Sequence, residues 1–188
     1  MNKLINEDYF KNMEQKLAIE KITVENFKEY YLRLKLAIIN GKLENQLSYV
    51  TSLMGAFIFP VESADEREIV GLMLSDLDSI ATTLAQEQIT SINLTEYYSN
   101  FKSVSSKQAV SSKQLIDFYN FFMIAFFAKT SDVDLEEWHK LLSSTRLESC
   151  NYDEVEEVFF LRKKIKNLLR QIKRNDEIKK PYIKNISK

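Results

Sequence analysis

The stretch SSKQLIDFYNFFMIAFFA, residues 111–128, decides the fold class. It opens with Ser111 and has Gln114 three positions later, which is the capping-box pattern that begins an α-helix. From Leu115 to Ala128, apolar side chains then lie nearly all around the helix, so neighbouring helices must enclose it. This run spans about 21 Å as a helix, which is short of the roughly 30 Å of a bilayer core. We predict the central helix of a soluble helical bundle.

The pentapeptide VSSKQ occurs twice, at residues 104–108 and 110–114. Both copies contain the Ser-x-x-Gln capping pattern, but only the second leads directly into the apolar run. We therefore place the N-cap of this helix at Ser111 or Ser112, and the first copy in the connecting loop or a frayed turn. Two short copies are too few for a solenoid, in which longer units stack repeatedly.

The composition favours an all-α fold. Three Gly and two Pro among 188 residues leave few of the turn residues that β-hairpins need. Hydrophobic residues make up 45% of the chain and charged residues 28%, as in ordinary globular proteins. The single cysteine, Cys150, excludes an intramolecular disulfide and fits a reducing compartment. Because the amino end lacks the apolar core of a secretory signal, we predict a cytoplasmic protein.

Capping residues and apolar spacing divide the rest of the chain into helices. Besides the helix that begins near Ser111, we predict helices at about 6–20, 24–40, 43–58, 64–85, 94–102 and 152–175. Side chains suited to cap helix starts are those of Thr23, Ser63, Asn93 and Asn151. In the fourth helix, apolar spacing selects the positions Ile69, Leu72, Met73, Leu77, Ile80 and Leu84.

The predicted architecture is a single-domain, all-α helical bundle of about seven or eight helices. We expect the domain to cover residues 1–178 and to include a long amphipathic C-terminal helix. Residues 179–188 are expected to form a basic, flexible tail.

Charge is distributed unevenly along the chain. From Leu161 to Lys188 there are eleven Lys and Arg against two acids, whereas the first 160 residues carry 15 basic and 25 acidic side chains. The last predicted helix has an apolar stripe made of Val158, Leu161, Ile165, Leu168 and Ile172. Its basic side chains could bind nucleic acid, contact a membrane surface or a partner helix, or simply face water. For nucleic-acid binding the candidate residues are Arg162, Lys163, Lys166, Arg170 and Lys173.

Acidic side chains gather before and within two helix starts. Some of this clustering reflects the preference of carboxylates for helix N-termini, and solvated faces would explain the rest. Alternatively, the acids form a negative surface for a basic partner, with a tryptophan as aromatic anchor. The candidate partner-binding residues are Asp132, Asp134, Glu136, Glu137, Trp138, Asp153, Glu156 and Glu157.

Catalytic motifs are weak. Glu136 and the single histidine, His139, match one Glu-x-x-His element of di-iron bundles, but such sites require two elements. The isolated glycines form no phosphate-binding loop. We therefore expect no cofactor and no bound metal, and an enzyme with carboxylate or metal chemistry at Glu136 and His139 is a second alternative.

The first functional hypothesis is a non-catalytic protein-binding module. In its most concrete form it is a bacterial cytoplasmic inhibitor or immunity-type protein that neutralises a basic toxin or nuclease. The first alternative is a nucleic-acid-associated regulator that uses the basic C-terminal helix.

Overall fold

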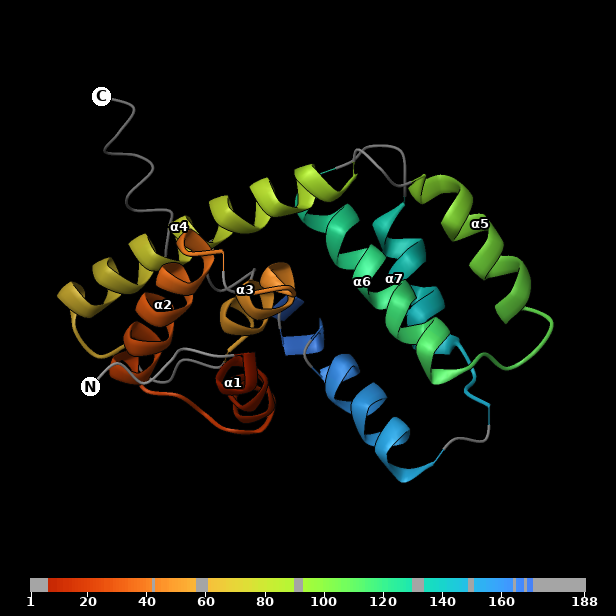
Figure 1. Cartoon of the computed structure of the whole chain (residues 1–188), viewed down its shortest axis with the longest axis horizontal. Helices are drawn as coiled ribbons and strands as arrows, with labels where there is room; N and C mark the ends of the chain where they lie inside the picture. The colour runs from red at the N-terminus through yellow and green to blue at the C-terminus, as the bar shows by residue number, and fades with distance from the viewer. Residues whose placement is uncertain are drawn as a thin grey trace. The chain divides into compact units, whose positions relative to one another are not determined.

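The computed structural model describes residues 7–41, 43–56, 61–89, 93–129, 134–148, 151–163, 165–167 and 169–170 (Figure 1). Its named helices are α1 (Glu7–Ile19), α2 (Val24–Ile39), α3 (Gln46–Met54), α4 (Ala64–Ile89), α5 (Leu94–Ser105), α6 (Ser112–Ala128) and α7 (Leu135–Ser144). Residues 152–163, 165–167 and 169–170 are also helical, and we call 152–163 the last helix. The predicted all-α helical bundle is confirmed. The predicted extension of the last helix to residue 175 and the predicted tail at 179–188 lie outside the described residues.

The chain divides into two compact units. The first comprises Met1–Ile80 with Lys163–Lys188, and the second comprises Ala81–Arg162. Helix α4 therefore contributes its first part to one unit and its last part to the other. The predicted single domain over residues 1–178 stays a prediction.

The predicted N-caps are confirmed. The Thr23 side chain accepts a hydrogen bond from the backbone N–H of Asn26, over 3.2 Å. At the start of α6, Ser111 and Gln114 form the complete reciprocal capping box. The same reciprocal pattern joins Ser63 with Glu66 at α4, and Asn93 accepts a hydrogen bond from the backbone of Glu96 at α5. These bonds satisfy backbone donors that the first helical turn leaves unpaired.

Helices α3 and α4 differ from their predicted forms, α5 ends at Ser105 and not at about 102, and α7 was not among the predicted helices. Helix α3 begins at Gln46 and ends at Met54, so it is shorter than the predicted 43–58. In α4 the apolar face was assigned wrongly at two positions, because Ile69 and Leu72 are 38% and 60% exposed. The buried face instead uses Val70, Met73, Leu74, Leu77, Ala81 and Ala85. The apolar spacing in the sequence is compatible with either face of the helix. The buried face includes Ala81 and Ala85, whose small side chains are a weak hydrophobic signal.

In the first unit, α3 lies at the centre. Its residues from Tyr49 to Met54 are all buried, and α1 and α2 both pack against it. The Tyr49 hydroxyl donates a 2.5 Å hydrogen bond to Glu7 of α1. Asp76 of α4 accepts hydrogen bonds from Tyr31 (2.8 Å) and Lys35 (2.9 Å) of α2. Side-chain hydrogen bonds between helices thus add to the stabilisation that the apolar core provides.

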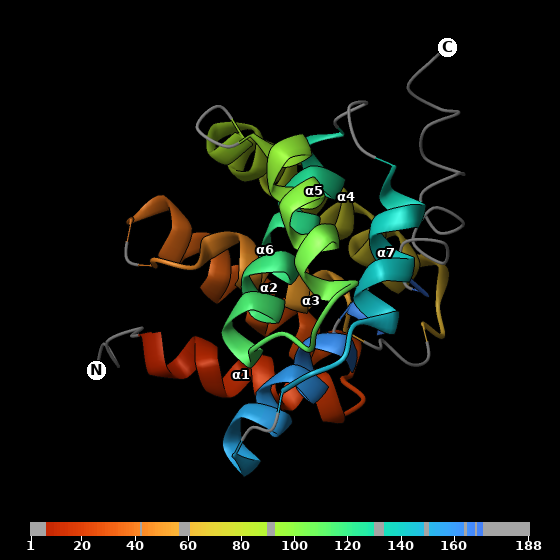
Figure 2. The ribbon, with the colours of Figure 1, turned by 90° about the vertical axis from the view of Figure 1, so that its right-hand side faces the viewer.

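In the second unit, α6 is the central helix, as predicted from its apolar run. Helices α5 and α7 pack against it, as both ribbon views show (Figures 1 and 2). Phe118 stacks on Phe101 with ring centroids 3.7 Å apart and lies 4.9 Å from the ring of Trp138. The phenylalanines of α6 therefore build an aromatic core. Within the described residues, no helix is long and apolar enough to cross a membrane.

Backbone hydrogen bonds join the segment that precedes α6 to the segment that follows α7. The backbone N–H of Val110 donates to the carbonyl of Arg146, and that of Glu148 donates to the carbonyl of Val110, both over 2.9 Å. This isolated bridge holds the segment after α7 beside the start of α6. The chain then enters the last helix close to the N-terminus of α6.

Candidate functional site

The start of the last helix is held in place by three side chains. Asn151 accepts a hydrogen bond from the Glu154 backbone N–H (2.9 Å), and Glu154 accepts one from the Asn151 backbone N–H (3.0 Å). The other carboxylate oxygen of Glu154 accepts a hydrogen bond from Ser112 at the start of α6, over 3.2 Å. The predicted capping role of Asn151 is confirmed. Because the first turn is tied to α6, its outward side chains project from a fixed helix.

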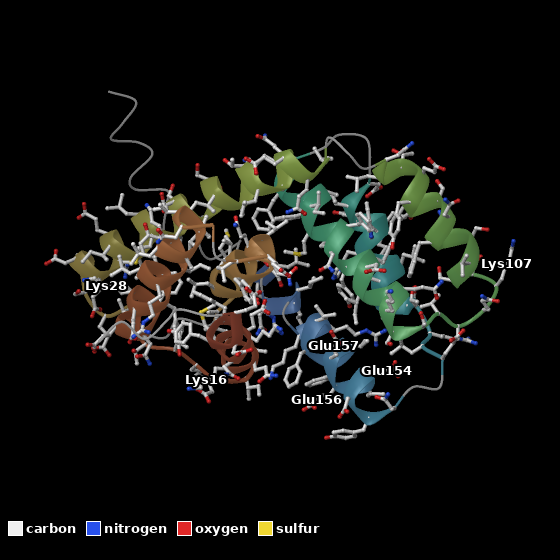
Figure 3. All side chains as sticks on the ribbon, viewed as in Figure 1. Lys16, Lys28, Lys107, Glu154, Glu156 and Glu157 are labelled. Atoms are coloured by element: carbon white, nitrogen blue, oxygen red, sulfur yellow. The ribbon has the colours of Figure 1, made fainter. Side chains whose placement is uncertain are left out.

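Asp153, Glu156 and Glu157, which we call the acidic row, are exposed on this helix. Figure 3 labels Glu156 and Glu157 on its first turns. Among the described residues, none forms an ion pair with these three carboxylates. The sequence has no Lys or Arg between Arg146 and Arg162. Negative charge is therefore concentrated on this part of the last helix.

Tyr152, Val155 and Phe159 form an exposed apolar row beside the carboxylates. Their exposed fractions are 79%, 48% and 59%. At about 100° per residue they share one face, between buried Val158 on one side and Glu156 on the other. This row was not predicted, although its i, i+3, i+7 spacing is visible in the sequence. We call the acidic row and the apolar row together the acidic-apolar face.

Arg162, a candidate for nucleic-acid binding, makes its hydrogen bond within the second unit. Its Nη2 donates a 3.2 Å hydrogen bond to the backbone carbonyl of Thr145. Its Nε is buried and has no hydrogen-bond partner among the described residues. Burial raises the pKa of the Tyr119 hydroxyl, and the neighbouring Arg162 opposes this rise. Arg162 therefore has a structural role.

The other candidate basic residues differ in exposure. Lys166 and Arg170 are exposed, whereas Lys163 is only half-exposed. Lys173 lies outside the described residues. The apolar stripe predicted for this segment is buried at Val158 and Ile165, with exposed fractions of 2% and 3%.

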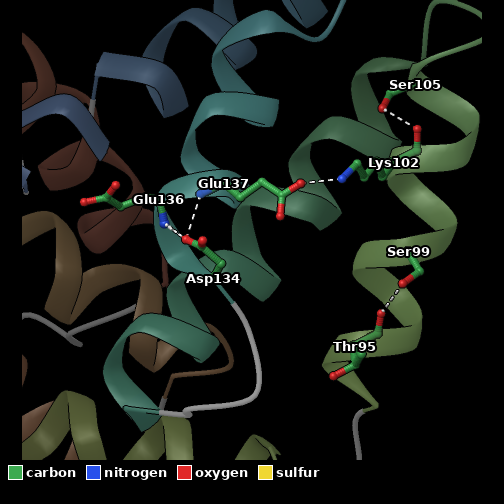
Figure 4. A network of polar contacts seen from close by, with 7 residues as sticks. All are labelled: Thr95, Ser99, Lys102, Ser105, Asp134, Glu136 and Glu137. Atoms are coloured by element: carbon green, nitrogen blue, oxygen red, sulfur yellow. Dashed lines mark hydrogen bonds and ion pairs between the residues drawn. The ribbon is translucent and has the colours of Figure 1, made fainter.

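The acids at the start of α7 are largely committed to local interactions (Figure 4). Asp134 is the N-cap, and its carboxylate accepts hydrogen bonds from the backbone of Glu136 (2.9 Å) and Glu137 (3.0 Å). Glu137 forms an ion pair with Lys102 of α5, and this partner lowers the pKa of its carboxyl group. In Figure 4 the Glu136 side chain points away from this pair. Asp132 lies outside the described residues.

Trp138 does not belong to an exposed surface. Its exposed fraction is 0%, and its ring lies 5.4 Å from that of Tyr98 and 4.9 Å from that of Phe118. The expectation that it anchors a partner was therefore wrong. An isolated tryptophan beside several acids resembles an exposed anchor in sequence, but it lies on the buried face of α7.

The structure does not bring the predicted acidic residues together. Helix α7 begins at the upper end of the second unit in Figures 1 and 2, whereas the last helix begins at its lower end. Only the second of the two acidic clusters adjoins an apolar row. We therefore place the candidate site on the last helix alone.

The alternative metal site has little support from the described residues. His139 is half-buried, and its ring centroid lies 6.3 Å from that of Phe122. In the described ranges, no three or more His, Cys, Asp and Glu side chains are grouped so that they could hold a metal ion. Cys150 lies outside those ranges.

No protein-family model, curated protein or solved structure matches this chain.

Proposed function

We propose that this chain is a non-catalytic protein-binding module whose partner is a basic protein. The acidic-apolar face carries the proposal. Apolar side chains at the centre of an interface supply most of the affinity, and surrounding charges set specificity and association rate. Tyr152 and Val155 would act as apolar contacts, while Glu156 and its neighbours attract positive charge.

In its most concrete form, the proposal is a bacterial cytoplasmic inhibitor of immunity type that neutralises a basic toxin or nuclease. The first 160 residues carry 15 basic and 25 acidic side chains, which favours association with a cationic protein. A carboxylate surface could cover the positive site with which a nuclease binds phosphate. Bacterial origin, compartment and partner belong to this proposal.

The test is capture of proteins from cell extract on the immobilised chain, followed by mass spectrometry. We expect a basic protein to be enriched, and we expect Glu156→Lys with Glu157→Lys to reduce its capture mainly by slowing association. The matched control is Glu20→Lys with Glu44→Lys, which makes the same charge change at exposed positions of the first unit. Equal loss with both variants, or no loss with either, would contradict the proposal.

The nucleic-acid alternative is tested with the same protein. Exposed Lys166 and Arg170 are the described residues that favour it. Binding to phosphates must weaken steeply with salt, because neutralisation releases counterions. Binding that survives physiological salt and is lost in Lys166→Glu with Arg170→Glu would favour a nucleic-acid regulator instead.

A further inference from the structure

The acidic-apolar face has an asymmetry that restricts what can cover it. Glu156 borders the apolar row on one side, and Asp153 and Glu157 lie beyond it. On the other side of the apolar row lies Val158, which is buried in the core. A complementary partner must therefore place an apolar row over Tyr152 and Val155, with positive charges along one side of that row.

The shape of the face favours an α-helix as the binding element. Apolar side chains at i, i+3 and i+7 form a ridge about 10 Å long, and such ridges fit between the side-chain rows of another helix. Strand addition needs an open sheet edge, but the described residues offer only the isolated bridge between Val110 and Leu147. Helix-on-helix docking is thus the recognition mode that this surface supports.

A second copy of the chain is a poor fit. The basic segment that begins at Leu161 has the required composition, but its described apolar residues face the protein: Ile165 is buried, and Leu161 and Leu169 are half-buried. A second copy would have to unpack them before they could contact the face. A phosphate-rich surface is disfavoured because the carboxylates would repel it within about 8 Å at physiological salt.

We infer that the acidic-apolar face binds a basic amphipathic α-helix of the partner protein. The helix has apolar residues repeating every three or four positions, with Lys or Arg on the side that faces Glu156. This inference rests on the proposed function and specifies the partner's recognition element.

The experiment uses the full chain and labelled synthetic peptides in fluorescence anisotropy. The first probe is a Leu/Lys peptide of about 14 residues whose leucines share one helical face. The second has the same composition, but its order distributes the leucines around the helix. We expect the first peptide to bind about tenfold more tightly, which corresponds to about 1.4 kcal/mol.

Surface variants locate the binding site. Tyr152→Ser with Val155→Ser should abolish the preference for the amphipathic peptide while circular dichroism stays unchanged. The matched control is Leu32→Ser with Leu36→Ser, because these leucines of α2 are 51% and 53% exposed. The control should keep the preference. Glu156→Lys with Glu157→Lys should weaken the binding of both peptides.

The possible failures are distinguishable. Equal binding of both peptides that is sensitive to the Glu156 and Glu157 reversal would overturn the helix inference and leave the proposed function standing. Failure of the amphipathic peptide to bind, or loss of preference only in the α2 control, would also overturn the inference. A dimer that the Tyr152 and Val155 changes dissociate would assign the face to a second copy. Attachment to neutral phosphatidylcholine vesicles, lost in the same variant, would assign it to a membrane.

Discussion

The guanidinium of Arg162 donates a hydrogen bond from Nη2 to the backbone carbonyl oxygen of Thr145, over 3.2 Å. Thr145 is the C-cap of α7, where backbone carbonyls have no partner within the helix. The positive charge also suits the negative end of the α7 dipole. One side chain thus joins the last helix to the end of α7 and helps to fix the acidic-apolar face.

Arg162→Ala should lower the free energy of unfolding by about 1–3 kcal/mol, because a hydrogen bond from a charged group is lost and the Thr145 carbonyl is left unpaired. Urea unfolding followed by circular dichroism measures this loss. Lys166→Ala, at an exposed position further along the chain, should change the free energy by no more than about 0.5 kcal/mol. Equal effects of the two substitutions would show that Arg162 has no special structural role.

The two copies of VSSKQ provide a matched pair of substitutions. Ser111→Ala should destabilise the protein by about 1 kcal/mol, because it removes the N-cap of the central helix α6. Ser105→Ala changes the corresponding serine of the first copy, which lies at the end of α5 and caps no helix start. It should have a much smaller effect in the same urea titration. The reverse order would contradict our assignment of the two copies.

The helix starts were predictable because their determinants are local. Each predicted cap joins residues only three positions apart, as at Ser111 with Gln114. The bonds that position the last helix are different, since Ser112 with Glu154 and Arg162 with Thr145 span 42 and 17 residues. Such pairs form only when whole helices pack, so no spacing in the sequence indicates them.

The candidate site was predictable only in part. Its carboxylates stand out in the sequence, and so does the spacing of Tyr152 and Val155. Which apolar row faces the core depends on the neighbouring elements, and the structure buries the row of Val158. The same ambiguity explains the misassigned Leu72 of α4. It also explains Trp138, whose burial follows from its packing on α6 rather than from the acids around it.

Alkaline pH should destabilise the protein through tyrosines that are buried or half-buried. Burial, with a contribution from Asp117, raises the pKa of Tyr97 from 10.0 to about 12. Below pH 10 both the folded and unfolded chains keep the phenol proton, so this group adds no pH dependence. Between pH 10 and about 12 the unfolded chain loses the proton first, so stability falls. Burial also raises the pKa values of Tyr9, Tyr31, Tyr49, Tyr98 and Tyr119.

The measurement is the thermal midpoint at about pH 9 and about pH 11.5, followed by circular dichroism. Tyr97→Phe should lose less stability over this interval than the unsubstituted chain. Tyr152→Phe, at an exposed position, should behave like the unsubstituted chain. An identical alkaline loss in Tyr97→Phe would mean that Tyr97 does not contribute to it.

The acidic residues at the start of α7 should differ in how much they contribute to the free energy of unfolding. Asp134→Ala should cost about 1 kcal/mol of stability, since the carboxylate caps the helix, whereas Asp134→Asn should keep most of the cap. Glu136→Ala should have little effect on the free energy of unfolding, measured by urea titration. A larger loss at Glu136 than at Asp134 would contradict the capping geometry.

The central claim is that the acidic-apolar face is the surface that meets a basic partner. Nuclear magnetic resonance of the ¹⁵N-labelled full chain, titrated with the unlabelled amphipathic Leu/Lys peptide, tests it most directly. We predict that the backbone amide shifts change chiefly within residues 151–160, around Val155 and Glu156, with α2 and α7 little affected. Shift changes concentrated on α2 or α7, or their absence from residues 151–160 at saturating peptide, would contradict the claim.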